Sequence, residues 1–117
     1  MSQPAFPYTP AVRAGDWLVI SGQLGLKDGT LVGTDLASQT QQAMANLKSL
    51  VESNGARMDQ VAKCMVFLTD MNDFAEMNSY YTPPFGDHRP ARSCIGVAAL
   101  PLGARVEVEA WVYTGAA

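Results

Sequence analysis

The sequence is poor in charge and in histidine, and it has no long hydrophobic run. Charged residues make up 16% of the 117 residues, whereas about a quarter is usual. The net charge is −3 and the pI is about 4.9, so the chain lacks the basic surface that binds a phosphate backbone. No stretch approaches the roughly 18 consecutive apolar residues of a membrane-spanning helix. We therefore expect a protein that binds neither nucleic acid nor a membrane.

Cysteine is also scarce, and the start of the chain has no secretory pattern. The segment Met1 to Pro7 lacks both the basic and the apolar stretch of a signal peptide, so we expect a cytoplasmic protein. Cys64 and Cys94 are the two cysteines, and neither belongs to a Cys-x-x-Cys pair of the kind found in zinc and redox sites. We expect both thiols to be reduced and free of a disulfide.

The apolar content, by contrast, is high for so short a chain. A length of 117 residues corresponds to about one domain, so we expect a single domain over 1–117. Hydrophobic residues make up 48% of it, and a domain of this size buries only about 65% of its unfolded surface. Some apolar surface is therefore expected to meet another subunit.

Two segments have helical periodicity. From Asp35 to Val51 apolar residues recur three or four positions apart, and Asn54-Gly55 supplies a stop, which predicts an amphipathic helix. Residues 70–72 can cap a second helix that Pro83-Pro84 ends. The apolar face predicted for this second helix consists of Phe74, Met77 and Tyr81.

Strand patterns fill most of the remainder. Residues 1–14 contain three prolines and are predicted to form an extended arm. Asp28-Gly29 is a hairpin turn signal. The predicted strands cover Trp17–Gly22, Val61–Thr69, Arg92–Ala99 and Ala104–Tyr113. The order ββ-α-β-α-β-β predicts an α+β fold with a mainly antiparallel, mixed sheet and both helices on one face.

The last predicted strand has two different faces. Alternation puts Val106, Val108, Ala110 and Val112 on one side. It puts Arg105, Glu107, Glu109, Trp111 and Tyr113 on the other. Two helices cover only one side of a sheet, so the second face meets solvent or a subunit. The two large aromatic residues favour a subunit.

Familiar catalytic signatures are weak. Gly22 and Gly25 follow a strand into a hairpin and do not open a helix, so they do not form a phosphate-binding loop. His88 is the only histidine, and we interpret it as a solvated loop residue because it has neither a metal-ligand pattern nor a nucleophile motif beside it. The methionines Met58, Met65, Met71 and Met77 are interpreted as core or interface filler.

Three charged residues in the last two strands stand out. Arg92 begins a strand of small and apolar residues, where a guanidinium can pair with a planar carboxylate or form an ordinary surface ion pair. Glu107 and Glu109 either lie on a solvated face or include one carboxylate with a buried polar role. The residue pattern leaves these alternatives open.

Taken with their neighbours, these residues resemble a known family. The run Pro90–Cys94 together with Val106–Val108 is similar to the signature of the Rid family, the reactive intermediate (2-imino acid) deaminases. The resemblance extends in order over most of the chain, through residues 7–15, 20–23, 39–47, 66–74 and 77–78.

The resemblance implies a chorismate-mutase-like fold and a homotrimer with sites between subunits. It implies that Arg92 binds the substrate carboxylate and that Glu107 handles the hydrolytic water. Tyr8 and Ser21 match hydroxyl-bearing site residues, and Cys94 borders the site. The implied reaction is hydrolysis of a 2-imino acid to a 2-oxo acid and ammonia, without a metal or organic cofactor. A regulatory trimer that binds small carboxylates without turnover is the alternative, and an endoribonuclease is less favoured because one histidine and a net charge of −3 suit it poorly.

Overall fold

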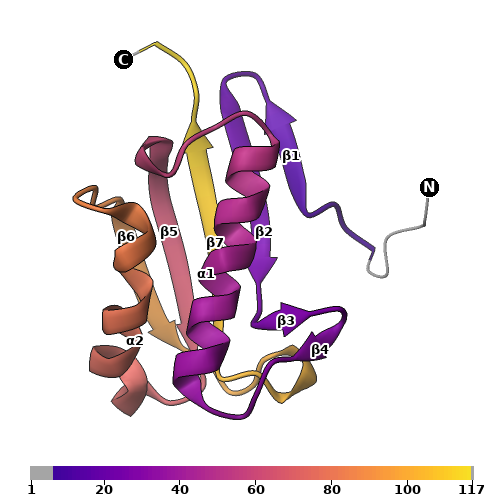
Figure 1. Ribbon diagram of the computed structural model, residues 1–117, viewed down its shortest axis with the longest axis vertical. Coiled ribbons are helices and arrows are strands. Elements are labelled where there is room, and N and C mark those ends of the chain that lie inside the picture. The colour runs from indigo at the N-terminus through magenta and orange to yellow at the C-terminus, as the bar shows by residue number, and fades with distance from the viewer. Residues whose placement is uncertain (1–6, 117) are drawn as a thin grey trace.

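The computed structural model describes residues 7–116 and contains a five-stranded sheet (Figure 1). The strand order is β1-β2-β7-β5-β6. All neighbours are antiparallel except β5 and β6, which are parallel. The strands are β1 (Ala11–Ala14), β2 (Trp17–Gln23), β5 (Val61–Leu68), β6 (Ala91–Gly96) and β7 (Val106–Tyr113). A separate two-stranded ribbon pairs β3 (Leu26–Lys27) with β4 (Thr30–Leu31).

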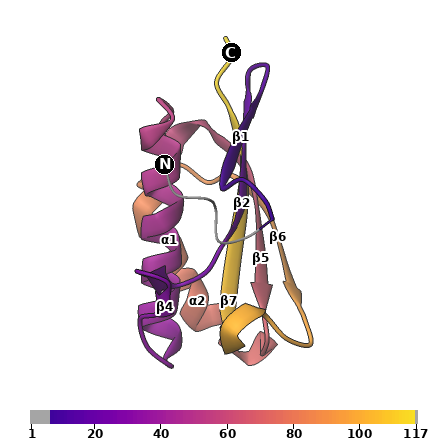
Figure 2. The ribbon, with the colours of Figure 1, turned by 90° about the vertical axis from the view of Figure 1, so that its right-hand side faces the viewer.

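Both helices lie on the same face of the sheet, as predicted (Figure 2). They are α1 (Leu36–Ser53) and α2 (Phe74–Tyr81). Short 3-10 turns cover Met58–Gln60, Met71–Asp73, Pro83–Phe85 and Pro101–Gly103. The predicted α+β class with a mixed, mainly antiparallel sheet is therefore confirmed. Within residues 7–116 no helix has the length and apolar character needed to cross a bilayer.

Local sequence explains where α1 begins and how it packs. The side chain of Asp35 accepts a hydrogen bond from the Ser38 N–H at 2.9 Å and so caps the first turn. The residues that α1 buries against the sheet recur at helical spacing: Leu36, Gln39, Thr40, Ala43, Met44, Leu47 and Val51. The predicted apolar stripe is thus confirmed, with Leu50 packed at its margin.

The alternation predicted for the last strand is confirmed for β7. Its four even-numbered residues from Val106 to Val112 are buried beneath the helices. Glu107, Glu109 and Trp111 are half-buried on the opposite face, which no helix covers, and Tyr113 is 38% exposed. The Tyr113 ring meets Trp17 edge-on, with ring centroids 5.0 Å apart.

Two strand predictions were wrong in extent. Residues 11–14 of the predicted arm form β1, a hairpin partner of β2 that turns through Gly15 at a φ of 60°. Residues 1–6 of that arm lie outside the described part of the chain. The strand predicted for 92–99 is β6, and it ends at Gly96, because β5, its parallel partner, ends at Leu68, the residue that pairs with Gly96.

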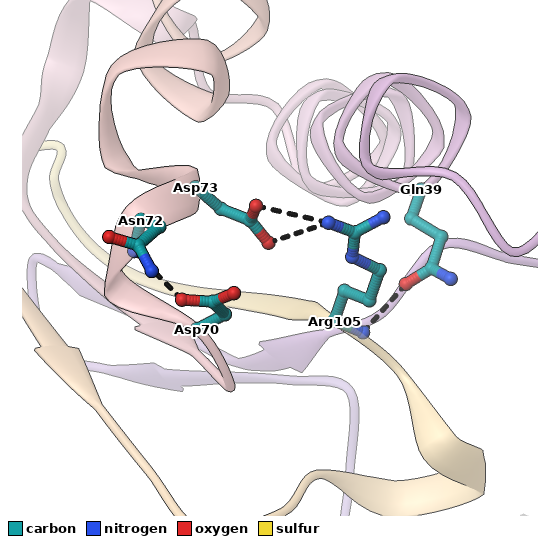
Figure 3. Close-up of polar contacts among 5 residues, drawn as sticks. All are labelled: Gln39, Asp70, Asn72, Asp73 and Arg105. Atoms are coloured by element: carbon teal, nitrogen blue, oxygen red, sulfur yellow. Dashed lines mark hydrogen bonds and ion pairs between the residues drawn. The ribbon is translucent and has the colours of Figure 1, made fainter.

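The prediction that placed Arg105 beside Glu107 was also wrong. Strand β7 begins at Val106, two residues after the predicted start, and Arg105 turns toward the helices, where its Nη2 contacts both carboxylate oxygens of Asp73 at 2.9 and 3.0 Å (Figure 3). The Arg105 N–H donates to Oε1 of the buried Gln39 at 2.8 Å. Asp70, at the head of the same turn, accepts from the Asn72 N–H at 2.9 Å and so caps the 3-10 turn Met71–Asp73. The prediction that residues 70–72 cap the second helix was wrong, because α2 begins at Phe74, after Asp73, whose side chain forms no cap hydrogen bond. Arg105 therefore ties the start of β7 to both helices.

The methionine interpretation holds for part of the set. Met58 and Met77 are buried, whereas Met65 is half-buried and Met71 is 43% exposed. Both cysteines are free thiols, with Cys64 buried and Cys94 half-buried.

Candidate functional site

Three of the predicted site residues lie together where β2 ends. Tyr8, Ser21 and Glu107 line one open cavity of about 310 Å³, with Gly22 and Pro101 completing its wall. The Ser21 hydroxyl donates to the carbonyl of Thr9 at 2.7 Å, so it fastens the segment that carries Tyr8 onto β2. The strand thus brings an N-terminal residue beside a carboxylate from the last strand.

An irregularity in β2 makes room for the Glu107 carboxylate. The register with β7 shifts between Ile20 and Gln23, as at a β-bulge, a feature often found beside active sites. A Cβ added at Gly22 would overlap Oε2 of Glu107. Glycine at this position therefore allows the carboxylate to lie directly against the backbone of β2.

The electrostatic environment of Glu107 makes its carboxylate a stronger base than that of an ordinary glutamate. Burial raises the pKa of Glu107, and the nearby Glu109 raises it further. Burial also raises the pKa of Glu109. Neither carboxylate forms an ion pair within residues 7–116. A carboxyl group with a raised pKa is better suited to accept a proton near neutral pH than an ordinary glutamate.

The raised pKa of Glu107 predicts that Glu107→Gln stabilises the fold at neutral pH. A raised folded pKa contributes stability that is fully present below the ordinary pKa of 4.5 and is lost as the pH rises through the folded value. Glutamine has no such loss, so the melting temperature of Glu107→Gln should exceed that of the wild type at pH 7 and match it near pH 4. Thermal melts across this pH range measure the difference.

The matched control is Glu52→Gln, which changes an exposed glutamate on α1. Its melting temperature should follow that of the wild type at every pH. A Glu107→Gln melting temperature that tracks the wild type across the whole pH range would contradict the assigned electrostatics.

Arg92 lies in a separate group, against α2. Its Nη1 donates to Oδ1 of Asn78 at 2.7 Å. Its guanidinium carbon lies 4.8 Å from the centre of the Tyr81 ring and 5.3 Å from that of Phe74, within the range of cation–π attraction. One hydrogen bond and two rings therefore hold the guanidinium in place.

The Tyr81 ring that supports Arg92 is itself anchored in the core. Tyr81 is 3% exposed and packs against Phe85, with ring centroids 5.1 Å apart. Burial raises the pKa of its hydroxyl, and burial also raises the pKa of the neighbouring Cys64 thiol. Both groups therefore stay neutral at physiological pH, so neither supplies a negative charge that would pair with Arg92.

Register places the two groups on opposite faces of the sheet. Arg92 pairs with Cys64 and Cys94 pairs with Val66, and both partners are buried beneath the helices. Glu107 pairs with Phe67, on the uncovered face. Burial raises the pKa of Cys94, which keeps its thiol protonated near neutral pH. A single chain thus presents Arg92 with Cys94 on one side and Tyr8, Ser21 and Glu107 on the other.

Sequence reasoning missed the residues that hold Arg92. Phe74 and Tyr81 are predicted only as part of the apolar face of the second helix. In the structure Phe74 is 37% exposed, Tyr81 is buried, and both rings face the guanidinium. Asn78 was not singled out as a partner of Arg92. The spacing of 74, 78 and 81 on one helical face was the available signal.

His88 differs from its predicted role as a solvated loop residue. It is half-buried, its Nε2 lies 2.8 Å from the carbonyl oxygen of Val61, and its ring meets Phe85 edge-on. This hydrogen bond joins the loop before β6 to the start of β5. Among the described residues, no cluster of three or more His, Cys, Asp or Glu side chains could hold a metal ion.

Comparisons with known proteins agree over nearly the whole chain. A family model described as Endoribonuclease L-PSP matches residues 1–114. A RutC family protein of Pyrococcus horikoshii is 41% identical over 113 residues, covering 95% of this chain and 90% of that protein. The 2-iminobutanoate/2-iminopropanoate deaminase of Escherichia coli is 39% identical over 108 residues, covering 89% and 84%.

The fold has close counterparts among solved structures. The crystal structure of Escherichia coli TdcF with bound serine superposes with a TM-score of 0.88 at 33% identity, covering 94% of this chain and 90% of that one.

Proposed function

Because this chain belongs to the endoribonuclease L-PSP family and, within it, to the Rid proteins, we propose that it hydrolyses 2-imino acids to 2-oxo acids and ammonia. The observation that carries the proposal is the held guanidinium of Arg92. Asn78 accepts a hydrogen bond from one of its N–H groups, and two rings lie within cation–π range of it. A guanidinium has five N–H donors, so several remain for a carboxylate.

The opposite placement of Arg92 and Glu107 supports a site built from two copies of the chain. Each copy would supply the carboxylate anchor to one site and the Tyr8, Ser21 and Glu107 group to another. The uncovered sheet face suits such an assembly, because Trp17, Val19 and Trp111 line an apolar depression on it. We propose the chorismate-mutase-like trimer of the family, with Cys94 at the edge of the site.

The proposed chemistry needs few protein groups. Water adds to the imine carbon as its proton moves toward the Glu107 carboxylate, which gives a carbinolamine. The protonated Glu107 then returns this proton to the nitrogen. The carbon–nitrogen bond breaks and ammonia leaves as the carbonyl group forms, and the hydroxyl proton passes to the departing ammonia, which leaves as ammonium. A protonated imine is already electrophilic, so positioning and proton transfer supply the catalysis. Tyr8 and Ser21 would orient the substrate or the water.

The test couples an amino-acid oxidase to this protein and traps the remaining imine with semicarbazide. Active protein is expected to lower the yield of semicarbazone formed from the imine, because hydrolysis competes with trapping. An unchanged yield over a range of protein concentrations would rule out the deaminase. Calorimetry with 2-oxobutyrate run in parallel identifies the alternative, a regulatory protein that binds carboxylates without turnover.

A further inference from the structure

A second cavity opens from the mouth of the first and runs toward α1. Its volume is about 280 Å³, and it shares Tyr8, Gly22, Pro101 and Glu107 with the first cavity. Its remaining lining residues are Pro10, Gln23, Leu24, Leu26 and Asn46. A molecule held at Glu107 would therefore have a direct path into it.

The cavity exists because β2 loses its outer neighbour. Pairing with β1 ends at Ile20, and the Ser21 N–H donates to the Pro10 carbonyl at 2.9 Å. The chain then turns into β3. The Asn46 amide donates to the carbonyl of Leu24, in this turn, at 3.0 Å and to that of Leu26, at the start of β3, at 2.9 Å. These two bonds fix the wall that the leucines form.

Two polar side chains in the inner part of the cavity, those of Asn46 and Gln23, form hydrogen bonds within the chain. The Asn46 amide nitrogen is bound to two carbonyls, and its Oδ1 accepts from Nε2 of Gln42 at 2.8 Å. The Gln23 amide donates to the Ser21 carbonyl at 2.9 Å. A polar group entering beside Asn46 would lose water and meet an amide that is already bonded on both its nitrogen and its oxygen, whereas an apolar group would gain from burial against Leu24 and Leu26.

We infer that this cavity binds the side chain of the 2-imino acid, and that Leu24 and Leu26 select neutral aliphatic side chains larger than a methyl group. The inference rests on the proposed function, which puts the reacting carbon at Glu107. The cavity volume is several times the roughly 30 Å³ of a water molecule in the liquid, so an isobutyl group fits. The Glu107 carboxylate at the entrance disfavours acidic side chains.

The experiment compares the imines derived from leucine and alanine by the oxidase-coupled assay. The wild type is expected to have the higher kcat/KM for the leucine-derived imine. Leu26→Trp fills the cavity and should lower the leucine-to-alanine ratio of kcat/KM about tenfold or more. The matched control Val32→Trp alters a 39% exposed residue just beyond β4 that does not line the cavity, and it should leave the ratio unchanged.

A second variant and a binding measurement keep the test decisive. If Leu26→Trp does not fold, Leu26→Ala enlarges the cavity and should raise the phenylalanine-to-leucine ratio. If no imine is hydrolysed, the deaminase proposal fails, and calorimetry still tests the cavity. 4-Methyl-2-oxopentanoate should then bind more tightly than pyruvate, and Leu26→Trp should remove the difference. The inference would be overturned if the wild type had the same kcat/KM for imines with short, long and acidic side chains. It would also be overturned if neither Leu26 variant changed the ratios of kcat/KM between substrates.

Discussion

Replacing Arg92 with alanine is expected to lower kcat/KM for 2-imino acid hydrolysis by about 100- to 1000-fold. The guanidinium forms the charge-assisted contact with the substrate carboxylate in the proposed site, and such contacts stabilise a complex by several kcal/mol. Without the anchor, the imine carbon no longer lies at the position that the water attacks, so KM should rise and kcat should fall. The oxidase-coupled assay over a range of imine concentrations separates the two effects.

Two further variants serve as controls for the loss of activity in Arg92→Ala. Arg57→Ala removes an arginine whose side chain is 69% exposed and whose ion pair with Asp59 lies on the surface, so kcat/KM should change less than twofold. Arg92→Lys keeps the charge but loses the planar fork that matches a carboxylate, and it should recover only part of the activity. Full activity in Arg92→Ala would remove the basis of the proposed site.

The spacing of apolar residues along the sequence was enough to predict those parts of the fold that belong to a single helix or a single strand. The 18-residue helix α1 is predicted by the spacing of its apolar residues and by Asp35 at its N-cap. The strict alternation of β7 reveals its two faces because one face alone meets the helices. In both cases a single period and a single buried face determine the outcome.

Features that depend on pairing between distant segments were not predictable in the same way. β1 is a four-residue strand in a proline-rich stretch, and it is stabilised by its hairpin pairing with β2. Arg105 fits the alternation of β7 by sequence, yet the buried Asp73 carboxylate draws it to the helices. A favourable ion pair outside the strand thus outweighs the strand pattern.

The division of the candidate site is the main example. The sequence singles out Arg92 and Glu107, but their faces follow from the registers of β6 and β7 on β5. The parallel pairing that sets Arg92 opposite Cys64 is a tertiary property that no local pattern encodes. A reading of the residues alone therefore finds both charges without showing that one chain holds them apart.

That separation predicts that two inactive variants restore activity when mixed. Arg92→Ala lacks the carboxylate anchor, and Glu107→Gln lacks the group that takes the proton from water, so each homo-oligomer should be nearly inactive. In a random mixed oligomer, a site is intact when an unmodified Arg92 from one chain meets an unmodified Glu107 from its neighbour. Each condition holds for about half of the chains in an equal mixture, so roughly one quarter of the wild-type activity should return.

The recovered fraction distinguishes a shared site from a site within one chain. Mixing Arg92→Ala with the double variant Arg92→Ala/Glu107→Gln should give no recovery, because every anchor is then missing. Native mass spectrometry of isotope-labelled chains verifies that subunits have exchanged. If exchange is complete and the first mixture stays inactive, Arg92 and Glu107 must act within one chain, which the opposite faces of the sheet do not allow without rearrangement. Recovery near one quarter, on the other hand, requires that the two faces described for one chain meet across a boundary between chains, whatever the number of subunits in the ring.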